Sequence, residues 1–337
     1  MDSVGLKEAL YWEKTGTGRV LCLLCPHGCR IAEGQVGLCR VRKNVGGALF
    51  TLNYGRISAA NLDPVEKKPL FHFYPGSVIL SVGTVGCNLA CSFCQNWAIA
   101  QTGEVDGTRS LSPERAVALA ASEPGNIGLA YTYNEPFTWF EYVLETAELA
   151  RARGMKNVLV TNGYVQEEPL RRLLPLVDAM NVDVKSMSER FYRELCRGRP
   201  EPPKRTVELA KEHGCAVEVT NLVIPNWNDS ERDLRALVDW MAGVDPDLPL
   251  HFSRYHPDHQ LTEPPTPADT LFRARELAKE KLRYVYIGNL WHATGENTEC
   301  PACGKTVVER RGFAVARVAV TNGKCDFCGA GIPIVGT

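Results

Sequence analysis

Short apolar runs alternate with amphipathic stretches between residues 76 and 292. The apolar runs have the length of buried β-strands, and they cover 78–82, 127–132, 157–161, 179–184, 216–220, 250–253 and 284–287. Helical patterns lie between them at 112–121, 137–153, 204–213 and from the predicted N-cap Asp229 to Met241. This alternation, with a period of about 30 residues, predicts an α/β fold in which helical crossovers connect parallel strands.

Polar or thiol side chains follow the predicted strands directly. They are Cys87, Asn134, Glu135, Asn162, Asp183, Lys185, Asn221, Arg254, His256 and Asn289. In a parallel (β/α) barrel the active site lies at the carboxyl ends of the strands. The pattern therefore predicts a site at one mouth of a partial or full barrel. The competing interpretation is that any strand leaving a core ends in polar residues.

Two flanking segments differ in composition from this region. Residues 1–75 form a Gly-rich and Cys-rich N-terminal extension, and residues 293–297 have the composition of a linker. We therefore expect three parts, which are the extension at 1–75, the barrel at 76–292 and a small Cys-rich tail at 293–337.

Composition places the chain among ordinary globular proteins. Its 337 residues are 45% hydrophobic and 23% charged, which excludes a disordered or fibrous chain. The formal net charge of -1 provides no basic field, so a nucleic-acid or membrane partner is not expected. No apolar run reaches the roughly 18 residues of a membrane span, and the start Met1-Asp2-Ser3-Val4-Gly5 lacks a signal-peptide pattern. We expect a cytoplasmic protein.

The chain contains 13 cysteines, and all except Cys196 and Cys215 belong to three local groups. The groups are Cys22, Cys25, Cys29 and Cys39; Cys87, Cys91 and Cys94; and Cys300, Cys303, Cys325 and Cys328. Disulfides are disfavoured in the reducing cytosol, so clustered thiols in a long chain indicate metal sites. Cys196 and Cys215 are interpreted as buried small hydrophobic residues.

The central group has the spacing C-x3-C-x2-C directly after the first predicted strand. A cubane cluster has four irons and usually four thiolate ligands, so Cys87, Cys91 and Cys94 alone would leave one iron open. An open coordination position is typical of a catalytic metal centre. The alternatives are a three-cysteine zinc site completed by a distant His, and a cluster whose fourth ligand comes from elsewhere in the chain.

The two outer groups predict different sites. Cys300, Cys303, Cys325 and Cys328 form two C-x2-C-Gly knuckles, which favour a closed tetrahedral zinc site over iron, with a structural or protein-docking role. The N-terminal group offers four thiols and the nearby His27. Three hypotheses remain open for that group, namely a structural zinc, an auxiliary iron-sulfur cluster and free thiols packed in a core.

Several segments resemble a known family. The central cysteine spacing, Phe93 before the last cysteine and the position after the first barrel strand resemble the radical S-adenosylmethionine (SAM) superfamily, over residues 76–292. Other segments resemble its glycyl-radical-enzyme activases, such as pyruvate formate-lyase activating enzyme. A narrower resemblance, to the radical SAM member of the AmmeMemoRadiSam system, is carried by Cys25-Pro26-His27, Gln95-Asn96-Trp97, 131–136 and 253–257.

The resemblance implies a [4Fe-4S] cluster on the central cysteines and SAM bound at its open iron. Phe93 is then expected near the adenine, and Asn221 near the nucleoside. Asn134 and Glu135 fall where the family has a Gly-Gly-Glu-Pro motif, but Tyr133 and Asn134 replace its two glycines. Glu135 is expected to contact the methionine amino group.

Further cofactor and substrate candidates lie after the later strands. Asp183 and Lys185 resemble the Asp-x-Lys motif of the activases, which is expected to bind the ribose hydroxyls and the carboxylate of SAM. The alternative is that the two residues form a salt bridge at the barrel rim. Asn162 is a further cofactor-binding candidate. Arg254 and His256 are the catalytic candidates facing the substrate, although a His beside a proline is as often a surface residue.

The implied activity is reductive cleavage of SAM to a 5'-deoxyadenosyl radical, which takes hydrogen from an unidentified small molecule or protein. A low-potential electron donor such as ferredoxin or flavodoxin is the expected partner. Activation of a glycyl radical enzyme is the alternative within the family. A non-catalytic zinc-ribbon interaction protein is the alternative from another class.

Overall fold

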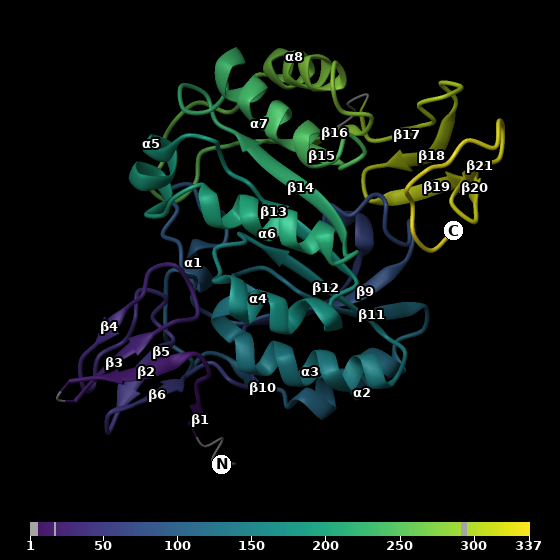
Figure 1. Cartoon of the computed structure of the whole chain (residues 1–337). Coiled ribbons are helices and arrows are strands. Elements are labelled where there is room, and N and C mark those ends of the chain that lie inside the picture. Colours follow the sequence, from purple (N-terminus) through teal and green to yellow (C-terminus); the bar gives the residue numbers. More distant parts are fainter. Residues whose placement is uncertain (1–5, 17, 291–294) are drawn as a thin grey trace.

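The computed structural model describes residues 6–16, 18–290 and 295–337. Its centre is an eight-stranded sheet with the order β16-β15-β14-β13-β12-β11-β9-β8 (Figure 1). The strands from β9 to β16 pair in parallel, whereas β8 pairs antiparallel with β9. Their bounds are β8 Ala59–Pro64, β9 Val78–Gly83, β11 Asn126–Tyr131, β12 Lys156–Thr161, β13 Ala179–Asp183, β14 Ala216–Val223, β15 Leu250–Arg254 and β16 Val285–Gly288.

The sheet confirms the predicted α/β fold and every strand predicted from an apolar run. It is open, with β8 and β16 at its edges, so the barrel is partial. Strand β8 comes from the segment assigned to the N-terminal extension, yet it pairs with β9 along its whole length. The domain boundary at residue 75 stays a prediction.

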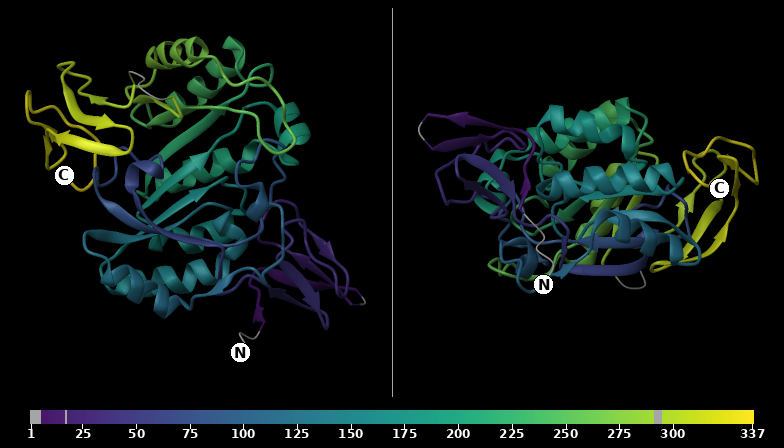
Figure 2. Two further views of the ribbon diagram at one scale, coloured as in Figure 1. Left: turned by 180° about the vertical axis from the view of Figure 1, so that it is seen from behind. Right: turned by 90° about the horizontal axis from the view of Figure 1, so that it is seen from below.

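Helices cover the outer face of the curved sheet (Figure 1), and the view from behind shows the strands themselves (Figure 2). The helices are α1 Trp97–Ala100, α2 Pro113–Ser122, α3 Phe140–Ala152, α4 Glu167–Leu173, α5 Glu189–Phe191, α6 Glu201–Glu212, α7 Glu231–Val244 and α8 Ala268–Lys279. A π-helix, Tyr192–Cys196, follows α5. The open inner face is where a ligand can reach the strand ends.

The predicted cap of α7 is wrong by one residue. The hydroxyl of Ser230 accepts a hydrogen bond from the backbone N–H of Asp233 at 3.2 Å, so Ser230 is the N-cap. Asp229 instead accepts from the backbone N–H of Asn226 at 2.9 Å. Both side chains can cap a helix, and the turn that Asp229 closes delays the helix start by one residue.

Short antiparallel strands make up most of the N-terminal segment. They form two small sheets, β1-β6-β5 and β2-β3-β4, while β7 pairs with β10. A buried ion pair between Arg42 and Glu141 of α3 joins this segment to the barrel. The bounds are β1 Lys7–Glu8, β2 Trp12–Thr15, β3 Arg19–Cys22, β4 Arg30–Ile31, β5 Arg42–Val45, β6 Ala48–Thr51, β7 Arg56–Ile57 and β10 Arg109–Ser110.

The C-terminal tail is a small β module beside the opposite end of the barrel (Figures 1 and 2). Buried Arg310 donates to the backbone carbonyl of Phe71 at 2.7 Å, and the N–H of Tyr74 donates to the carbonyl of Val335 at 2.7 Å. Part of the predicted linker, 293–294, lies outside the described residues. The bounds are β17 Thr298–Glu299, β18 Thr306–Arg311, β19 Ala314–Val318, β20 Val320–Thr321 and β21 Lys324–Cys325.

The segment before β9 packs against the inside of the barrel. The backbone N–H of His72 donates to Glu218 at 2.7 Å, and Glu218 also binds His251 at 2.6 Å. Asn181 of β13 donates to the carbonyl of Pro69 at 2.8 Å. Since Glu218 and Thr220 are two residues apart on β14, they share a face of the sheet. The segment thus supports the floor beneath the strand ends.

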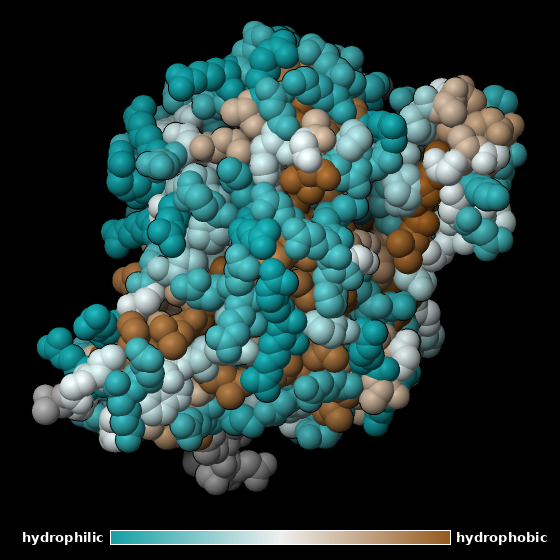
Figure 3. All heavy atoms as spheres, in the orientation of Figure 1, coloured by the Kyte–Doolittle hydropathy of each residue, from teal (hydrophilic) through white to brown (hydrophobic). Residues whose placement is uncertain are grey.

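The face shown in Figure 3 is largely hydrophilic, and hydrophobic residues gather where the two terminal segments meet the barrel. Within the described part of the chain, no helix is long and apolar enough to cross a membrane.

Candidate functional site

A cavity of about 600 Å³ lies at the carboxyl ends of the parallel strands. This is the mouth at which the sequence predicts a site. The predicted residues that line it are Cys87, Cys91, Cys94, Phe93, Asn134, Glu135, Asn162, Asp183, Lys185 and Asn289. The structure therefore brings together residues that lie up to 202 positions apart, since Cys87 and Asn289 share one cavity.

The three central thiols lie in the loop between β9 and α1. Burial raises the pKa of Cys94 to about 11 and raises that of Cys87 further. Cys91 behaves differently, because the neighbouring thiol of Cys196 lowers its pKa. The carbonyls of Leu195 and Cys196 also accept the backbone N–H groups of Ser92 and Ala90. The π-helix therefore supports the cysteine loop through both backbone and side chain.

Cys196 is thus more than the buried small hydrophobic residue that the sequence predicts. It is fully buried, as predicted, and its thiol is a neighbour of a central cysteine. No local pattern signals this contact, because the two cysteines are 105 residues apart in the sequence. Cys215 is buried at the start of β14 and confirms its interpretation.

Asp183 and Lys185 form an ion pair inside the cavity, with 3.3 Å between Oδ2 and Nζ. Burial opposes the charge on Lys185, but the Asp183 carboxylate raises the Lys185 pKa well above its usual value. The ammonium group lies 5.7 Å from the ring centre of Phe93. The pair therefore presents one carboxylate and one ammonium beside the central cysteines.

The backbone around this pair is held on several sides. The hydroxyl of Tyr192 accepts from the N–H of Lys185 at 3.0 Å, and Asn228 donates to the Lys185 carbonyl at 2.8 Å. Asn221 donates to the carbonyls of Val184 and Lys185, at 2.8 and 3.2 Å. Asn221 is buried and is not among the cavity-lining residues, so it positions the loop rather than lining the ligand space.

Tyr133 occupies the position of a family glycine and adopts a left-handed backbone with φ of 72°. Non-glycine residues seldom take this conformation because of steric crowding at Cβ. Its hydroxyl donates to Asp63 of β8 at 2.6 Å, and the Lys68 ammonium lies 4.7 Å from its ring centre. The side chain therefore anchors a turn that a glycine forms without help.

Glu135 is buried, and its carboxylate organises the adjoining strand end. It accepts from the N–H groups of Phe137 and Asn162, at 3.0 and 2.8 Å, and from the hydroxyl of Thr161 at 2.7 Å. Burial raises its pKa to about 7, against the effect of these donors. Glu135 still lines the cavity, so a cationic group of a ligand can bind its carboxylate there.

Asn134 and Asn162 brace the loop that carries the cysteines. Asn134 donates to the carbonyl of Gly86 at 2.7 Å and accepts from the N–H of Thr84 at 3.1 Å. Asn162 donates to the side-chain carbonyl of Asn88 at 3.0 Å and lies 3.6 Å from the thiol of Cys87. Each has a structural role besides lining the cavity.

The two catalytic candidates lie apart from these residues. Arg254 donates to the carbonyl of Thr266 at 2.9 Å, and His256 is exposed, 3.4 Å from the amide nitrogen of Gln95. Gln95 lines the cavity, whereas neither Arg254 nor His256 is among the described residues that do. Their catalytic roles stay predictions.

Phe313 and Thr220 are among the cavity residues that sequence reasoning missed. Phe313 reaches the cavity from the hairpin turn between β18 and β19, so the C-terminal module contributes to the mouth. Thr220 also lines the cavity, whereas its hydroxyl is buried away from the open space and has no hydrogen-bond partner in the described structure.

The C-terminal cysteines converge on one point. The four sulfur atoms all lie within 4.8 Å of one another, with Cys300 and Cys328 3.7 Å apart and Cys303 and Cys325 3.9 Å apart. A tetrahedral zinc with Zn–S bonds of 2.3 Å requires sulfur separations of ~3.8 Å. The geometry confirms a candidate metal site here.

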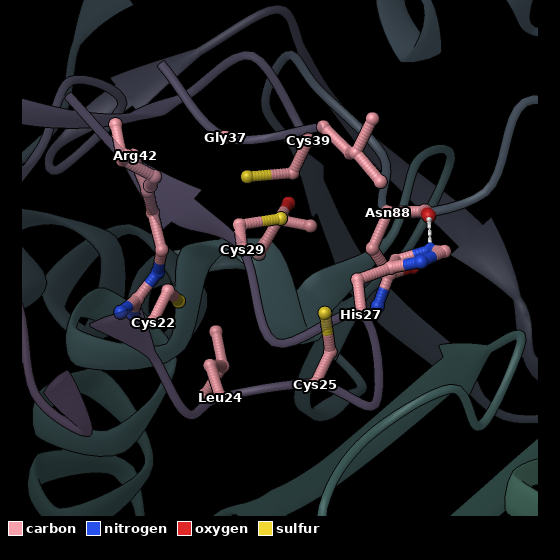
Figure 4. Close-up of a pocket in the computed structure, with 12 residues that line it drawn as sticks. Cys22, Leu24, Cys25, His27, Cys29, Gly37, Cys39, Arg42 and Asn88 are labelled. Atoms are coloured by element: carbon pink, nitrogen blue, oxygen red, sulfur yellow. Dashed lines mark hydrogen bonds between the residues drawn. The ribbon is translucent and has the colours of Figure 1, made fainter. Parts of the chain in front are cut away.

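The N-terminal cysteines surround a separate, smaller pocket (Figure 4). Cys22, Cys25, Cys29 and Cys39 line it together with His27. Burial raises the pKa of Cys39 to about 11 and also raises that of Cys29.

Comparison with known proteins identifies the family. The sequence model of the Radical SAM superfamily matches residues 81–238, which contain the central cysteines and the Asp183–Lys185 pair. Residues 81–238 form a radical SAM domain. The chain is also 44% identical to the uncharacterized protein MJ0808 of Methanocaldococcus jannaschii, over 98% of this chain and 100% of that protein.

Two further comparisons agree with this assignment. The chain is 27% identical to the biotin synthase of Beijerinckia indica subsp. indica over 176 residues, which are 50% of this chain and 54% of that one. A crystal structure of a radical SAM methyltransferase from Sphaerobacter thermophilus superimposes with a TM-score of 0.50 at 15% identity, covering 64% of this chain and 67% of that one. This likeness is one of fold. The AmmeMemoRadiSam resemblance stays a prediction.

The cavity of this radical SAM protein fits the family's cofactors. Cys87, Cys91 and Cys94 supply three thiols for a [4Fe-4S] cluster and leave one iron for SAM. The carboxylate of Asp183, which lines the cavity, can accept from ribose hydroxyls. Glu135 and Lys185 match the amino and carboxylate groups of the methionine part by charge.

Proposed function

We propose that this protein is a radical SAM enzyme that cleaves SAM reductively and uses the 5'-deoxyadenosyl radical to take hydrogen from a substrate. The observation that carries the proposal is the convergence of three thiols and two oppositely charged groups, Asp183 and Lys185, in one cavity. The cluster and SAM supply the radical when bound. The chain's own residues bind, orient and shield them.

The Asp183–Lys185 pair is proposed to orient SAM. Asn221, Asn228 and Tyr192 hold its backbone, so the two charges are fixed before the ligand arrives. Such preorganisation lowers the entropic cost of placing a reactive group. The pair then contributes positioning rather than acid-base chemistry.

The substrate is proposed to enter beside Gln95 and Phe313. The cavity of about 600 Å³ lies within the size range of ligand sites, and its mouth is formed partly by the C-terminal module. Both a small molecule and a protein segment fit an open mouth of this kind. Arg254 and His256 are the proposed contacts for the substrate at the rim near Gln95.

Electron paramagnetic resonance (EPR) tests the proposed SAM site. In anaerobically reconstituted and dithionite-reduced protein, SAM is expected to change the signal of the catalytic cluster, because it coordinates the open iron. Cys94→Ala should abolish that change, whereas Cys215→Ala, which alters a buried cysteine outside the cavity, should preserve it. An unchanged wild-type signal at saturating SAM would refute the proposed site.

A further inference from the structure

The N-terminal pocket is ringed by four thiols that come from different segments. Cys22 ends β3, Cys25 and Cys29 lie in the following turn, and Cys39 precedes β5 (Figure 4). The rest of the lining is mainly apolar and includes Leu24, Ile31 and Leu38. The pocket has a volume of about 20 Å³, more than the ~10–15 Å³ that one water needs.

The spacing of these thiols differs from that of the C-terminal site. Among the described residues, the C-terminal four are the one group of three or more potential metal ligands whose ligand atoms all lie within 4.8 Å of one another. The N-terminal thiols surround the pocket, and their sulfur atoms do not converge within that distance. A single zinc ion requires sulfur atoms ~3.8 Å apart, so the N-terminal arrangement is too wide for one.

The catalytic cysteines provide a reference within the same chain. Cys87, Cys91 and Cys94 do not meet the 4.8 Å condition either, although their family binds a cubane with them. In a cubane each thiolate binds a different iron, so the sulfur atoms lie farther apart than around one ion. The N-terminal set also falls outside the 4.8 Å condition, and it has the fourth thiol that the catalytic set lacks.

Charge at the pocket also favours an anionic centre. The guanidinium of Arg42 lies beside Cys22 (Figure 4), and it is 1% exposed. Its Nη2 pairs with Glu141 and its Nη1 donates to the carbonyl of Leu10, but its Nε is buried without a partner. An unpaired buried N–H is costly unless an acceptor is present. A thiolate or sulfide in the pocket would provide one.

We propose that Cys22, Cys25, Cys29 and Cys39 bind a second [4Fe-4S] cluster. Four thiolates saturate its four irons, so no iron is open to SAM. A closed cluster of this kind transfers electrons and does not bind substrate. Its ligands differ from those of the proposed function, but its role in electron transfer rests on that function.

The pocket adjoins the catalytic cysteine loop. A hydrogen bond of 2.7 Å joins Nε2 of His27 to the carbonyl of Asn88, which directly follows Cys87. On the other side of Cys87, a Cβ added to Gly86 would lie 2.7 Å from the carbonyl oxygen of Cys39. The two cysteine loops are therefore packed against each other. One electron from a reduced low-potential donor protein can pass through the second cluster to the catalytic one, and the donor is oxidised by one electron.

Metal analysis of a chain without catalytic ligands tests the site. In the full-length Cys87→Ser/Cys91→Ser/Cys94→Ser variant, reconstituted anaerobically, we expect about four iron and about four acid-labile sulfide per chain. Reduction with dithionite should give the EPR signal of a reduced cubane. About two zinc per chain without iron, or no metal beyond the C-terminal zinc, would overturn the proposal.

Ligand variants in that background locate the cluster. Adding Cys39→Ser should remove most of the iron and the EPR signal, whereas Cys215→Ser should leave both unchanged. Retained zinc and an unchanged far-ultraviolet circular dichroism spectrum show that the variant is folded. Iron that survives the removal of Cys22 and Cys39 together in a folded chain would also overturn the assignment.

Discussion

The hydroxyl of Tyr133 donates a hydrogen bond to the carboxylate of Asp63 across 2.6 Å, linking the cavity-lining turn after β11 to strand β8. This contact spans 70 residues and holds Tyr133 in a left-handed conformation. The Gly-Gly-Glu-Pro motif that this segment resembles has glycine at this position. The chain thus reaches the same backbone shape by anchoring a large side chain.

Removing the anchor should loosen the turn. A hydrogen bond to a charged acceptor contributes about 1.5–3 kcal/mol. In Tyr133→Phe, water that binds Asp63 recovers part of this energy. We therefore expect the variant to bind SAM about fivefold more weakly, or weaker still. Cluster content should be unchanged. Isothermal titration with SAM checks this, and Tyr54→Phe, which removes a tyrosine hydroxyl bonded to Glu145 outside the cavity, is the matched control. Equal SAM affinity in all three proteins would contradict the anchoring role.

Loss of Asp183 should affect SAM more than cluster assembly. The Asp183 carboxylate lines the cavity, whereas the iron ligands are thiols, so Asp183→Ala is expected to weaken SAM binding about tenfold or more and to retain iron. Iron analysis and SAM titration on the same sample separate the two effects. Unchanged SAM affinity would refute the placement of ribose hydroxyls at Asp183.

The thiol of Cys196 should tune the catalytic cluster. The Cys196 thiol lowers the pKa of the neighbouring Cys91, and hydrogen bonds to ligand sulfurs raise the reduction potential of a cluster. A bond of about 1 kcal/mol corresponds to about 40 mV for one electron, so Cys196→Ala should lower the potential by about that amount. An EPR-monitored redox titration measures the shift. Cys215→Ala should leave the potential unchanged, and an equal shift in both variants would remove the assigned contact.

Buried His72 should make stability depend on pH. Burial lowers its pKa to about 4. Its Nδ1 donates to the carbonyl of Pro333, and Nε2 of the neutral ring accepts from the hydroxyl of Tyr286. The unfolded chain, with an ordinary His pKa near 6.5, binds more protons between pH 6.5 and 4. The stabilisation that depends on neutral His72 is therefore present in full above pH 6.5. The free energy of unfolding falls by up to about 3 kcal/mol as the pH drops towards 4.

Unfolding measured between pH 7.5 and 5 checks this dependence. His72→Gln cannot titrate, so its stability should be lower at pH 7.5 but should fall less steeply with acid. Equal slopes for the two proteins would show that other groups cause the pH dependence.

The sequence predicted those parts of the molecule that depend on local patterns. Buried strands such as β12 and β13 have continuous apolar runs, which are visible in the sequence. Cysteines a few residues apart can bind one metal centre together, so their spacing also predicts metal ligands. The contacts that sequence reasoning missed depend on packing between distant segments. Tyr133 meets Asp63, Cys196 meets Cys91, and Phe313 reaches the mouth from another module.

Two sequence predictions depended on distinctions that the pattern alone could not make. Asp229 and Ser230 both have capping side chains, and the turn closed by Asp229 decides between them. Asn221 has the polar character of a ligand-binding residue, but its amide binds the backbone of the neighbouring strand end. The sequence shows the chemical type of each side chain, whereas tertiary packing determines which way the side chain points.

The most direct test of the central claim is the yield of 5'-deoxyadenosine from SAM. Anaerobically reconstituted protein, reduced with dithionite, should form 5'-deoxyadenosine and methionine in equal amounts, and Cys215→Ala should do the same. Cys94→Ala should form neither above the level of a reaction without protein. Absence of 5'-deoxyadenosine from wild-type protein with a full catalytic cluster, or equal yields from wild type and Cys94→Ala, would contradict the account.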